Sequence, residues 1–406
     1  MTEEAKPAGP LSGLRVVDLT QALAGPYATQ ILGDLGAEVI KVEAPEGDIT
    51  RRLPPHFIGK ESAYYLSVNR NKHSIAIDLK AEAGKTLMRD LCAASDAVFE
   101  NFRPGVLDRL GLSYAALSAV KPGLIWCSIS GFGQEGPYRD RPAYDMIVQA
   151  MSGSMSITGE PNGPAVRSGV PLGDIAAGLY AVIGLLAALE ERRRTGRGKF
   201  VDVAMLDCQV AMLSYQAAYY LASGKAPNRQ GRGHDSIPTY RSFSCRDGHE
   251  VVITAITERM WQQLCRVLER PALLEDPRFQ NNELRFEHRA ALWPLLEAAF
   301  AERDAAQWVP ALIEAEIPAA MVNTLHESLN DPHVQHRNMV IELAGPAGEH
   351  ARVAGNPIKF RGQDETPPAY PPALGEDQDK ILTEVLGLSE AQIAELRRSN
   401  VIGPRR

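Results

Sequence analysis

Short β-branched segments alternate with helix-like segments through the first third of this 406-residue chain. Five segments have the composition of strands: LRVVDLT (14–20), AEVIKVE (37–43), HSIAIDLK (73–80), DAVFENF (96–102) and LIWCSIS (124–130). Helix-like stretches such as PYATQILGDLG, in which Pro26 suits a first helical position, separate several of them. Strands that alternate with helices need crossover connections, so the pattern predicts an α/β fold with a parallel sheet.

A longer apolar segment runs from Ile175 to Leu189 almost without a polar side chain. It is apolar nearly all round, so we expect a buried helix rather than one with an exposed face. The charged residues 190–194 predict its exit to solvent, and Gly196 and Gly198 supply the stop. The apolar run is shorter than the ~20 residues that span a bilayer. The segment after it, KFVDVAML (199–206), predicts another strand.

The composition of the chain changes near residue 222, where the segment ASGKAPNRQGRGHDSIP is rich in Gly, Pro and polar residues. A smaller α+β unit follows, and we expect it to be inserted between linkers. The predicted organisation has five parts: a large Rossmann-like domain (1–221), a linker (222–240), a small domain (241–330), a linker or return segment (331–375) and C-terminal helices that pack on the large domain (376–406).

Composition excludes several kinds of partner. The formal net charge of -7 argues against nucleic acid or an anionic membrane. Five scattered cysteines without a CxxC pair predict reduced thiols in a cytoplasmic protein, and the histidines have no metal-ligand spacing, so no metal site is expected. The opening MTEEAKPAGP has neither the arginines of a transit peptide nor the apolar core of a secretory signal.

Asp174 stands directly before the apolar segment and has two compatible interpretations. An aspartate there suits the N-cap of a helix, where its oxygen accepts from backbone N–H groups. The positive end of the helix dipole would keep the carboxylate ionised, and the preceding Gly173 would leave backbone exposed to a ligand. An ionised, positioned carboxylate can act as a base or as a covalent nucleophile, and the residues alone do not separate these roles.

Two further patterns concern ligands. Gly131, Gly133 and Gly136 in SGFGQEGPY have GxGxxG spacing after a strand, but Pro137 and a polar loop follow instead of a helix, which argues against a dinucleotide fingerprint.

Cations and one amide lie near the ends of predicted strands: Arg70, Lys72, Arg103, Arg109 and Asn101. Ligands of open parallel sheets bind at the carboxyl ends of strands, so this group suits a phosphorylated, polyanionic ligand, although each charge alone would suit a solvated loop.

These motifs in combination resemble class III CoA-transferases of the formyl-CoA transferase and carnitine-CoA transferase type. The resemblance covers residues 11 to 400 and is carried by LSGLRVVDLTQALAGPYATQILGDLGAEVIKVE, VNRNKHSIAIDLK, VFENFRPGVLDRLGL, SISGFGQEGPY, GDIAAGLYAVIGLLAALEERRRTGRGKFVDVAMLD and LGEDQDKILTEVLGLS. Within the family, GKESAYYLSVNRNKHSIAIDLK and GHDSIPTYRSF look most similar to succinyl-CoA:glutarate CoA-transferases.

The resemblance implies a Rossmann-like domain built from both chain ends, a smaller domain and an interlocked homodimer. It implies that Asp174 is the nucleophile, passing through an aspartyl anhydride and an aspartyl-CoA thioester. No permanent cofactor is implied, because acyl-CoA and a small carboxylic acid are the substrates. The implied CoA contacts are Leu23, Ala24, Lys72, Asn101, Phe102, Arg103 and Arg109. The implied substrate or oxyanion region contains Gly131, Gly133, Tyr144 and Gly173.

Departures from the family pattern bear on the substrate. Formyl-CoA transferases carry a glutamine where this chain has Leu23, and a glycine-rich loop where it has only GRGHDS, so formate or oxalate specificity is doubtful. A dicarboxylyl donor such as succinyl-CoA needs a second polar or cationic group to bind its far carboxylate, for which the small domain offers His234, Ser236, Tyr240 and Arg241.

Two alternative functions stay open. An α-methylacyl-CoA racemase would need a histidine where Tyr144 stands, and a dinucleotide-dependent oxidoreductase would need a true fingerprint.

Overall fold

The computed structural model describes residues 9–362, 365 and 368–403. Residues 1–8, which belong to the segment considered for a targeting signal, lie outside the described residues. The same holds for 363–364 and 366–367 of the predicted return segment and for 404–406 of the predicted C-terminal helices. The chain divides into two compact units. The first takes residues up to Ser154, Arg167–Gly224 and residues from His333 on, and the second takes Met155–Val166 and Lys225–Pro332. The sequence did not predict that residues 155–166 belong to the second unit.

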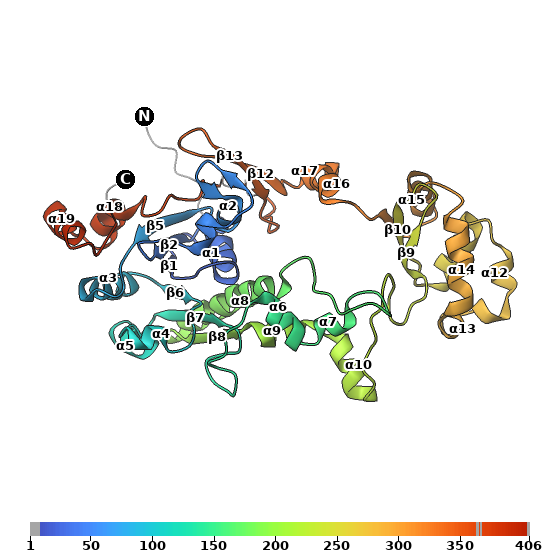
Figure 1. Ribbon diagram of the computed structural model, residues 1–406, viewed down its shortest axis with the longest axis horizontal. Helices are drawn as coiled ribbons and strands as arrows, with labels where there is room; N and C mark the ends of the chain where they lie inside the picture. Colours follow the sequence, from blue (N-terminus) through green and yellow to red (C-terminus); the bar gives the residue numbers. More distant parts are fainter. Residues whose placement is uncertain (1–8, 363–364, 366–367, 404–406) are drawn as a thin grey trace. The chain divides into compact units, whose positions relative to one another are not determined.

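A six-stranded parallel sheet forms the centre of the first unit (Figure 1). Its strands are β1 (Arg15–Asp18), β2 (Glu38–Glu43), β5 (Lys72–Ala76), β6 (Ala97–Glu100), β7 (Ile125–Ser130) and β8 (Phe200–Ala204). They lie in the order β5-β2-β1-β6-β7-β8. The predicted α/β fold with a parallel sheet is therefore confirmed, and each of the six segments expected to be a strand contains one.

Helices cover both faces of this sheet (Figure 1). One face carries α1 (Ala24–Asp34), α6 (Asp145–Met151), α8 (Leu172–Thr195) and α9 (Met205–Met212). The other carries α3 (Glu82–Ala93), α4 (Val106–Arg109), α5 (Tyr114–Val120), α18 (Gln378–Lys380), the π-helical turn Ile381–Val385 and α19 (Glu390–Arg398). Successive side chains of a strand point to opposite faces, so Val16 belongs to one core and Val17 to the other.

The order of the strands creates a switch point between β1 and β6. From β1 the chain builds outward through β2 and β5, and it then returns to build the other half through β6, β7 and β8. Ligands of open α/β sheets bind outside the carboxyl ends of the strands at such a point. The loops after Asp18 and after Glu100 are thereby brought together, although 80 residues separate Gln21 from Asn101.

Helix α8 differs from its prediction. Its small residues, Gly178 and Ala181 among them, are buried against α1 and the sheet, but Leu179 and Ile183 are 44% and 59% exposed. The expectation of a helix buried on all sides is therefore wrong for the single chain, since only one face finds a partner. Among the described residues α8 alone has the length and composition of a membrane span, which a core helix of a soluble protein also satisfies.

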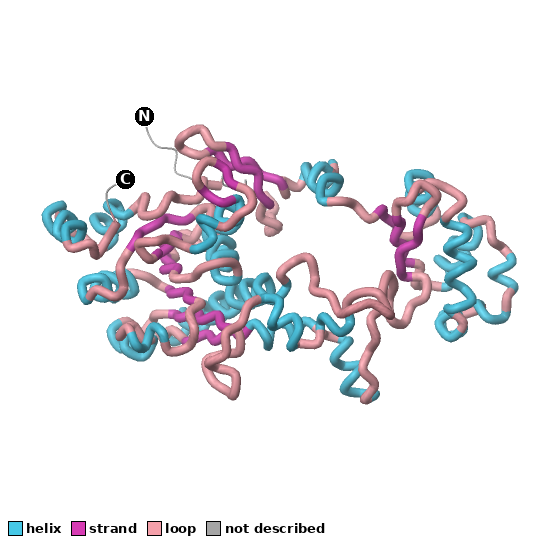
Figure 2. The backbone as a smooth tube through the Cα atoms, viewed as in Figure 1, coloured by secondary structure: helices cyan, strands magenta, loops and turns pink. Residues whose placement is uncertain are grey.

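The remaining elements of the first unit are small. They are β3 (Phe57–Ile58), β4 (Glu61–Ser62), α2 (Ala63–Val68), α7 (Ser154–Ile157, which ends in the second unit), α10 (Tyr215–Ser223), α17 (Pro332–His336), β12 (Val340–Ala344) and β13 (His350–Ala354). The last two strands pair antiparallel and form a hairpin. Figure 2 shows the strands of this unit in magenta and the loops between its elements in pink.

The second unit has a three-stranded antiparallel sheet in the order β11-β10-β9, with its own apolar core. Its strands are β9 (Tyr240–Ser244), β10 (Glu250–Thr254) and β11 (Ala319–Met321). Its main helices are α11 (Glu258–Val267), α12 (Ala272–Glu275), α13 (Asn282–Glu287), α14 (Arg289–Phe300), α15 (Ala305–Glu314) and α16 (Leu325–Asn330). The predicted smaller α+β unit thus contains both a sheet and helices.

Candidate active site

The turn between β1 and α1 is held in a strained conformation at the switch point. Ala22 has φ 65°, a left-handed value that residues with a Cβ rarely adopt. The Asn101 side chain accepts from the Gln21 N–H at 2.9 Å and donates to the Gln21 carbonyl at 2.8 Å. Strained backbone of this kind persists where its surroundings hold it, and it gathers at functional sites. Asn101 therefore shapes this turn, and its implied contact with CoA stays a prediction.

A network of buried charges lies beneath the same turn. Lys41 donates to the Thr20 carbonyl at 2.8 Å and to Asp48 at 3.0 Å, with both side chains of the ion pair fully buried. Burial raises the pKa of Asp18, but Lys72, Lys41 and two threonine hydroxyls outweigh it and lower that pKa to about 2. The ionised groups beneath the turn therefore restrict its movement.

Lys72 belongs to this buried network and not to an open binding surface. Its ammonium group donates to Asp18, to the Pro26 carbonyl and to Asn69, each at 3.0 Å, and its side chain is 0% exposed. Burial lowers its pKa to about 8. All three N–H donors of the ammonium are used in this structure, so Lys72 ties α1 to the sheet, and its implied contact with CoA stays a prediction.

Asp174 lies in the first turn of α8, but it does not cap the helix. The helix begins at Leu172 with Pro171 at the N-cap, so the N-cap interpretation is wrong. Asp145, at the start of α6, supplies the acceptor instead: its Oδ1 lies 2.8 Å from the Gly173 nitrogen and 3.4 Å from the Asp174 nitrogen. A carboxylate from another element satisfies these donors, which leaves the Asp174 side chain available for chemistry.

Two glycines of α8 bring Asp174 close to the switch point. A Cβ atom at Gly173 would lie 2.6 Å from Val148 Cγ2, and one at Gly178 would lie 2.7 Å from the carbonyl oxygen of Ala24. The second contact seats α8 against the beginning of α1. Asp174 precedes Gly178 by four residues, about 6 Å along the axis. The carboxyl group therefore lies near the turn containing Leu23 and Ala24, Leu23 being the N-cap of α1.

The Asp174 carboxyl is easier to protonate than an ordinary aspartate. Burial is the main cause, and the negative charge of Asp145 is the second; together they raise its pKa to about 7. Burial thus outweighs the helix dipole, and the expectation that the dipole keeps this group fully ionised is corrected. Tyr64 faces the same charges: burial first, then Asp174, raises its pKa to about 12. Neither Asp145 nor Tyr64 was singled out from the sequence.

This electrostatic arrangement predicts the pH dependence of the reaction. Only the ionised Asp174 is a nucleophile, so kcat/KM of the native enzyme is expected to fall about tenfold per pH unit below pH 7. Asp145→Asn keeps an oxygen acceptor for the helix but removes the charge, so the Asp174 pKa decreases and the acid limb moves to lower pH. Steady-state rates between pH 5 and 9 measure both profiles. An acid limb that stays in place in Asp145→Asn would refute this coupling.

The loop after β7 is fixed by its own hydrogen bonds. Gly133, with φ 90°, donates its N–H to Ser130 Oγ at 2.9 Å, and the Gln134 N–H donates to Asp202 at 2.9 Å. These two N–H donors and that of Gly173 are occupied in this structure, and the assignment of Gly131, Gly133, Tyr144 and Gly173 to a substrate or oxyanion region stays a prediction. Gly131 allows close packing, since a Cβ there would lie 2.3 Å from that of Ala143.

The other implied CoA residues follow β6. Phe102 is half-buried and donates its N–H to Glu100 at 2.9 Å, whereas Arg103 and Arg109 are exposed. Burial raises the pKa of Glu100 to about 7. A cavity of about 140 Å³ lies here and is lined by Glu100, Arg103, Pro104, Gly105, Leu107, Asp108, Ser113, Tyr114, Ala115, Trp126, Gln134 and Phe200. Arg103 and Arg109 thus lie at the carboxyl end of the sheet, as predicted. The prediction is wrong for Arg70, which precedes β5 and is buried in an ion pair with Asp34 at 2.6 Å.

Tyr144 lies directly before α6, next to the aspartate that caps α8. Its side chain is 79% exposed and makes no capping hydrogen bond. It stands where the racemase alternative needs a histidine, and an ordinary tyrosine is a poor base at neutral pH. The local geometry therefore offers no base for α-proton exchange at this position.

The four candidate clamp residues all lie in the second unit. His234 stacks on Tyr240 with ring centroids 5.3 Å apart, and its Nδ1 lies 3.2 Å from Ser236 Oγ. The Arg241 guanidinium lies over the Trp293 ring at 4.3 Å and donates to Glu297 at 3.2 Å. Arg241 is thus largely committed to packing within the unit.

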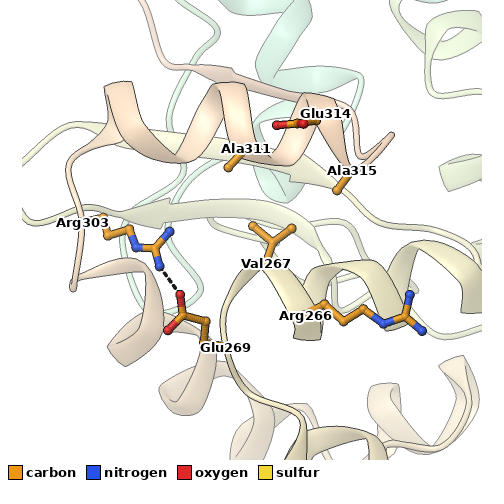
Figure 3. A pocket seen from close by; sticks show the side chains of 7 residues that line it. All are labelled: Arg266, Val267, Glu269, Arg303, Ala311, Glu314 and Ala315. Carbon is orange, nitrogen blue, oxygen red and sulfur yellow. Dashed lines mark hydrogen bonds and ion pairs between the residues drawn. The ribbon is translucent and has the colours of Figure 1, made fainter.

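A second pocket, of about 400 Å³, lies on the second unit (Figure 3). It is lined by Arg266, Val267, Glu269, Arg303, Ala311, Glu314 and Ala315. Arg303 pairs with Glu269 across it, so its charges are largely compensated. Among the described residues, no three His, Cys, Asp or Glu side chains are grouped to hold a metal ion.

The family of the chain follows from comparison with known proteins. Residues 11–378 match the family described as CoA-transferase family III. The chain therefore belongs to CoA-transferase family III, and it is an enzyme that uses CoA thioesters as substrates.

Three similar proteins illustrate the range of the family. The chain is 42% identical to a mouse (Mus musculus) protein named succinyl-CoA:glutarate CoA-transferase, covering 97% of this chain and 90% of the relative. It is 41% identical to an Acetobacter aceti protein named acetyl-CoA:oxalate CoA-transferase, covering 90% and 92%. A solved structure of a CAIB/BAIF family protein from Brucella suis has a TM-score of 0.84 at 40% identity, covering 93% of this chain and 100% of that one.

Proposed function

We propose that this enzyme moves CoA from succinyl-CoA, or a similar dicarboxylyl-CoA, to a dicarboxylic acid such as glutarate. The observation that carries the proposal is Asp174: a half-buried carboxyl in the first turn of α8, four residues before the glycine that packs on the beginning of α1. The substrate class is supported by the similarity to the relative named for succinyl-CoA and glutarate. The oxalate-named relative is nearly as similar, so overall identity does not determine the acceptor.

The first half of the mechanism makes the enzyme thioester. A carboxylate oxygen of Asp174 attacks the carbonyl carbon of the donor thioester, the C–S bond breaks, and a mixed anhydride and CoA thiolate form. The thiolate then attacks the γ-carbonyl carbon of Asp174. The anhydride C–O bond breaks, the donor acid leaves as its carboxylate, and CoA is bound to the enzyme as an aspartyl thioester.

The second half repeats these steps in reverse. The acceptor carboxylate attacks the aspartyl thioester and expels the thiolate, which forms a second anhydride. The thiolate attacks the acyl carbon of the acceptor, releasing the new acyl-CoA and the Asp174 carboxylate. The acyl group stays activated throughout, so the steps need neither ATP, metal nor a permanent cofactor. Water would hydrolyse both intermediates, and the burial that raises the Asp174 pKa also limits access of water.

A panel assay tests the substrate proposal. The purified enzyme is incubated with succinyl-CoA or acetyl-CoA and, in turn, with glutarate, oxalate, formate or acetate, and acyl-CoA products are identified by mass spectrometry. We expect glutaryl-CoA from succinyl-CoA as the fastest reaction. Transfer to formate or oxalate without transfer to glutarate would overturn the dicarboxylate assignment. Exchange of an α-proton with solvent without acyl transfer would favour the racemase alternative.

We also propose that the enzyme is a homodimer. One face of α8 exposes a cluster of apolar side chains in the single chain: Leu179, Tyr180, Ile183 and Leu186. Apolar patches of this kind mark protein contact sites in soluble proteins. Sedimentation equilibrium should give twice the chain mass of 44.2 kDa, and a monomer at micromolar concentration would contradict the proposal.

The cytoplasm is the compartment that we propose. All five cysteines are free and buried, which suits a reducing environment. The net charge of -7 supports small anionic substrates bound at local cationic sites, without nucleic acid or membrane as partners.

A further inference from the structure

The buried side chain of Gln149 joins two segments that lead to Asp174. Gln149 belongs to α6 and is 1% exposed. Its Nε2 donates to Asp145 Oδ2 at 2.7 Å, and its Oε1 accepts from the Ser168 N–H at 3.0 Å. Both ends of the carboxamide are therefore bound, one to the acid that caps α8 and the other to the backbone that precedes this helix.

The contact with Asp145 directs that carboxylate toward the beginning of α8. One carboxylate oxygen accepts from Gln149, and the other accepts from the Gly173 and Asp174 nitrogens at 2.8 and 3.4 Å. The terminal torsion of an aspartate is broad, so a carboxylate that is bound through one oxygen can rotate. The amide donor at the second oxygen restricts this rotation. Gln149 thus fixes the acceptor that fixes the backbone of Asp174.

The contact with Ser168 fixes the segment through which the chain enters α8. Residues 155–166 belong to the second unit, so Ser168 lies shortly after the chain returns to the first. The Ser168 hydroxyl accepts from the Val170 N–H at 3.3 Å, and the Leu172 N–H donates to the Val170 carbonyl at 2.8 Å. These hydrogen bonds connect Ser168 to the first residue of α8, so a shift of Ser168 would move the start of the helix and Asp174 with it.

We propose that Gln149 is a positioning residue for the reaction: by binding Asp145 and Ser168 together, it holds the Asp174 carboxyl in place for its attack on the thioester. A misplacement of about 1 Å can lower a rate about 10²-fold. Glutamine suits this role because its carboxamide has a donor for Asp145 and an acceptor for the Ser168 N–H. The inference rests on the proposed role of Asp174 as the nucleophile, but it does not depend on which acids are exchanged.

Steady-state kinetics with the fastest donor and acceptor of the panel assay test this role. Gln149→Met keeps an unbranched side chain of similar length but removes both the donor and the acceptor. We expect kcat at pH 8 to fall about 10–100-fold, with the KM for acyl-CoA within about twofold of the native value, because only the placement of the nucleophile changes. Calorimetric binding of CoA shows that the variant is folded.

Gln149→Glu separates positioning from packing. The neutral acid has the shape of glutamine and can donate to Asp145 and accept from the Ser168 N–H, whereas the ionised acid would oppose a second carboxylate. Two carboxylates in one site raise one pKa of the pair, so we expect about half or more of the native kcat at pH 6 and a loss of this recovery toward pH 9. Gln149→Met should stay low throughout. Asp145 of α6 and Tyr64 of α2, which interact electrostatically with Asp174, are unchanged in every variant.

Gln209→Met is the matched control, because it makes the same substitution at a glutamine that is equally buried. Gln209 is 2% exposed on α9, which packs against α6 and α8, and its Nε2 has no hydrogen-bond partner among the described residues. Its kcat should stay within about twofold of the native value.

Three results would overturn the positioning role: a native kcat in Gln149→Met, an equal loss in Gln209→Met, or equal rates of Gln149→Glu and Gln149→Met at pH 6. Native transfer by Asp174→Ala would instead count against the proposed nucleophile. An inactive Asp174→Ala beside a fully active Gln149→Met would count against Gln149 alone.

Discussion

Replacing Asp174 by alanine is expected to lower kcat/KM for CoA transfer by a factor on the order of 10⁴–10⁶, the scale seen when a nucleophile is removed. No neighbouring group replaces it as a nucleophile in the proposed mechanism, since Asp145 is occupied by backbone N–H groups of α8. CoA binding is expected to persist, because the implied CoA contacts lie on other loops. Product formation by mass spectrometry and CoA affinity by calorimetry measure the two effects separately.

The stability of the same variant has a definite pH dependence. Folding raises the pKa of Asp174 from 3.8 to about 7, so the folded chain binds more protons than the unfolded chain between these values. The native carboxyl therefore costs stability as the pH rises through this window. Asp174→Ala should be at least as stable as the native enzyme at pH 8, with the advantage shrinking toward pH 4. Thermal unfolding at both values measures it.

Trapping and a second variant complete this test. Hydroxylamine added during turnover should modify Asp174 if the aspartyl thioester forms, and Asp174→Asn should show neither turnover nor modification. Native transfer rates in Asp174→Ala, or trapping at another carboxylate, would refute the assignment.

Replacing Lys72 by methionine is expected to destabilise the fold and to leave CoA affinity unchanged in the protein that remains folded. The substitution removes the ammonium partner of Asp18 and leaves the Pro26 carbonyl without this donor. Breaking a buried ion pair by removing one partner costs about 3–5 kcal/mol, or roughly a 10 °C fall in Tm for a domain of this size. Thermal unfolding and CoA calorimetry report the two quantities.

A surface variant provides the comparison for Lys72→Met. Arg103→Gln changes an exposed cation of the cavity after β6, so it should keep the native Tm and weaken CoA binding if the resemblance assigns Arg103 correctly. The opposite pattern for Lys72→Met, a native Tm with a tenfold weaker CoA affinity, would show that its ammonium group reaches the ligand after all.

Local sequence patterns were sufficient to predict the strands and to single out the Asp174 carboxyl as a candidate for the chemistry. β-branched runs separated by helix-length segments required a parallel sheet, and an acid before a long apolar run marked the start of α8. The cap of that helix was not predictable, because Asp145 lies 29 residues from Asp174 and its own segment carries no signal for the contact. The pairing of Asn101 with Gln21 depends likewise on strand order.

The sequence by itself determined the type of fold, whereas only the tertiary structure decided which side chains are buried. Residue types and their spacing determined the α/β class, because hydrophobic periodicity and turn chemistry act over a few residues. The combination of motifs carried the resemblance to the family, and the resemblance implied Asp174 as the nucleophile. The tertiary structure decided which charges face solvent: it enclosed Lys72 with Asp18 and raised the pKa of Asp174. Solvation and Coulomb interactions depend on distances through space, and these distances exist only once the strands have been ordered in the sheet.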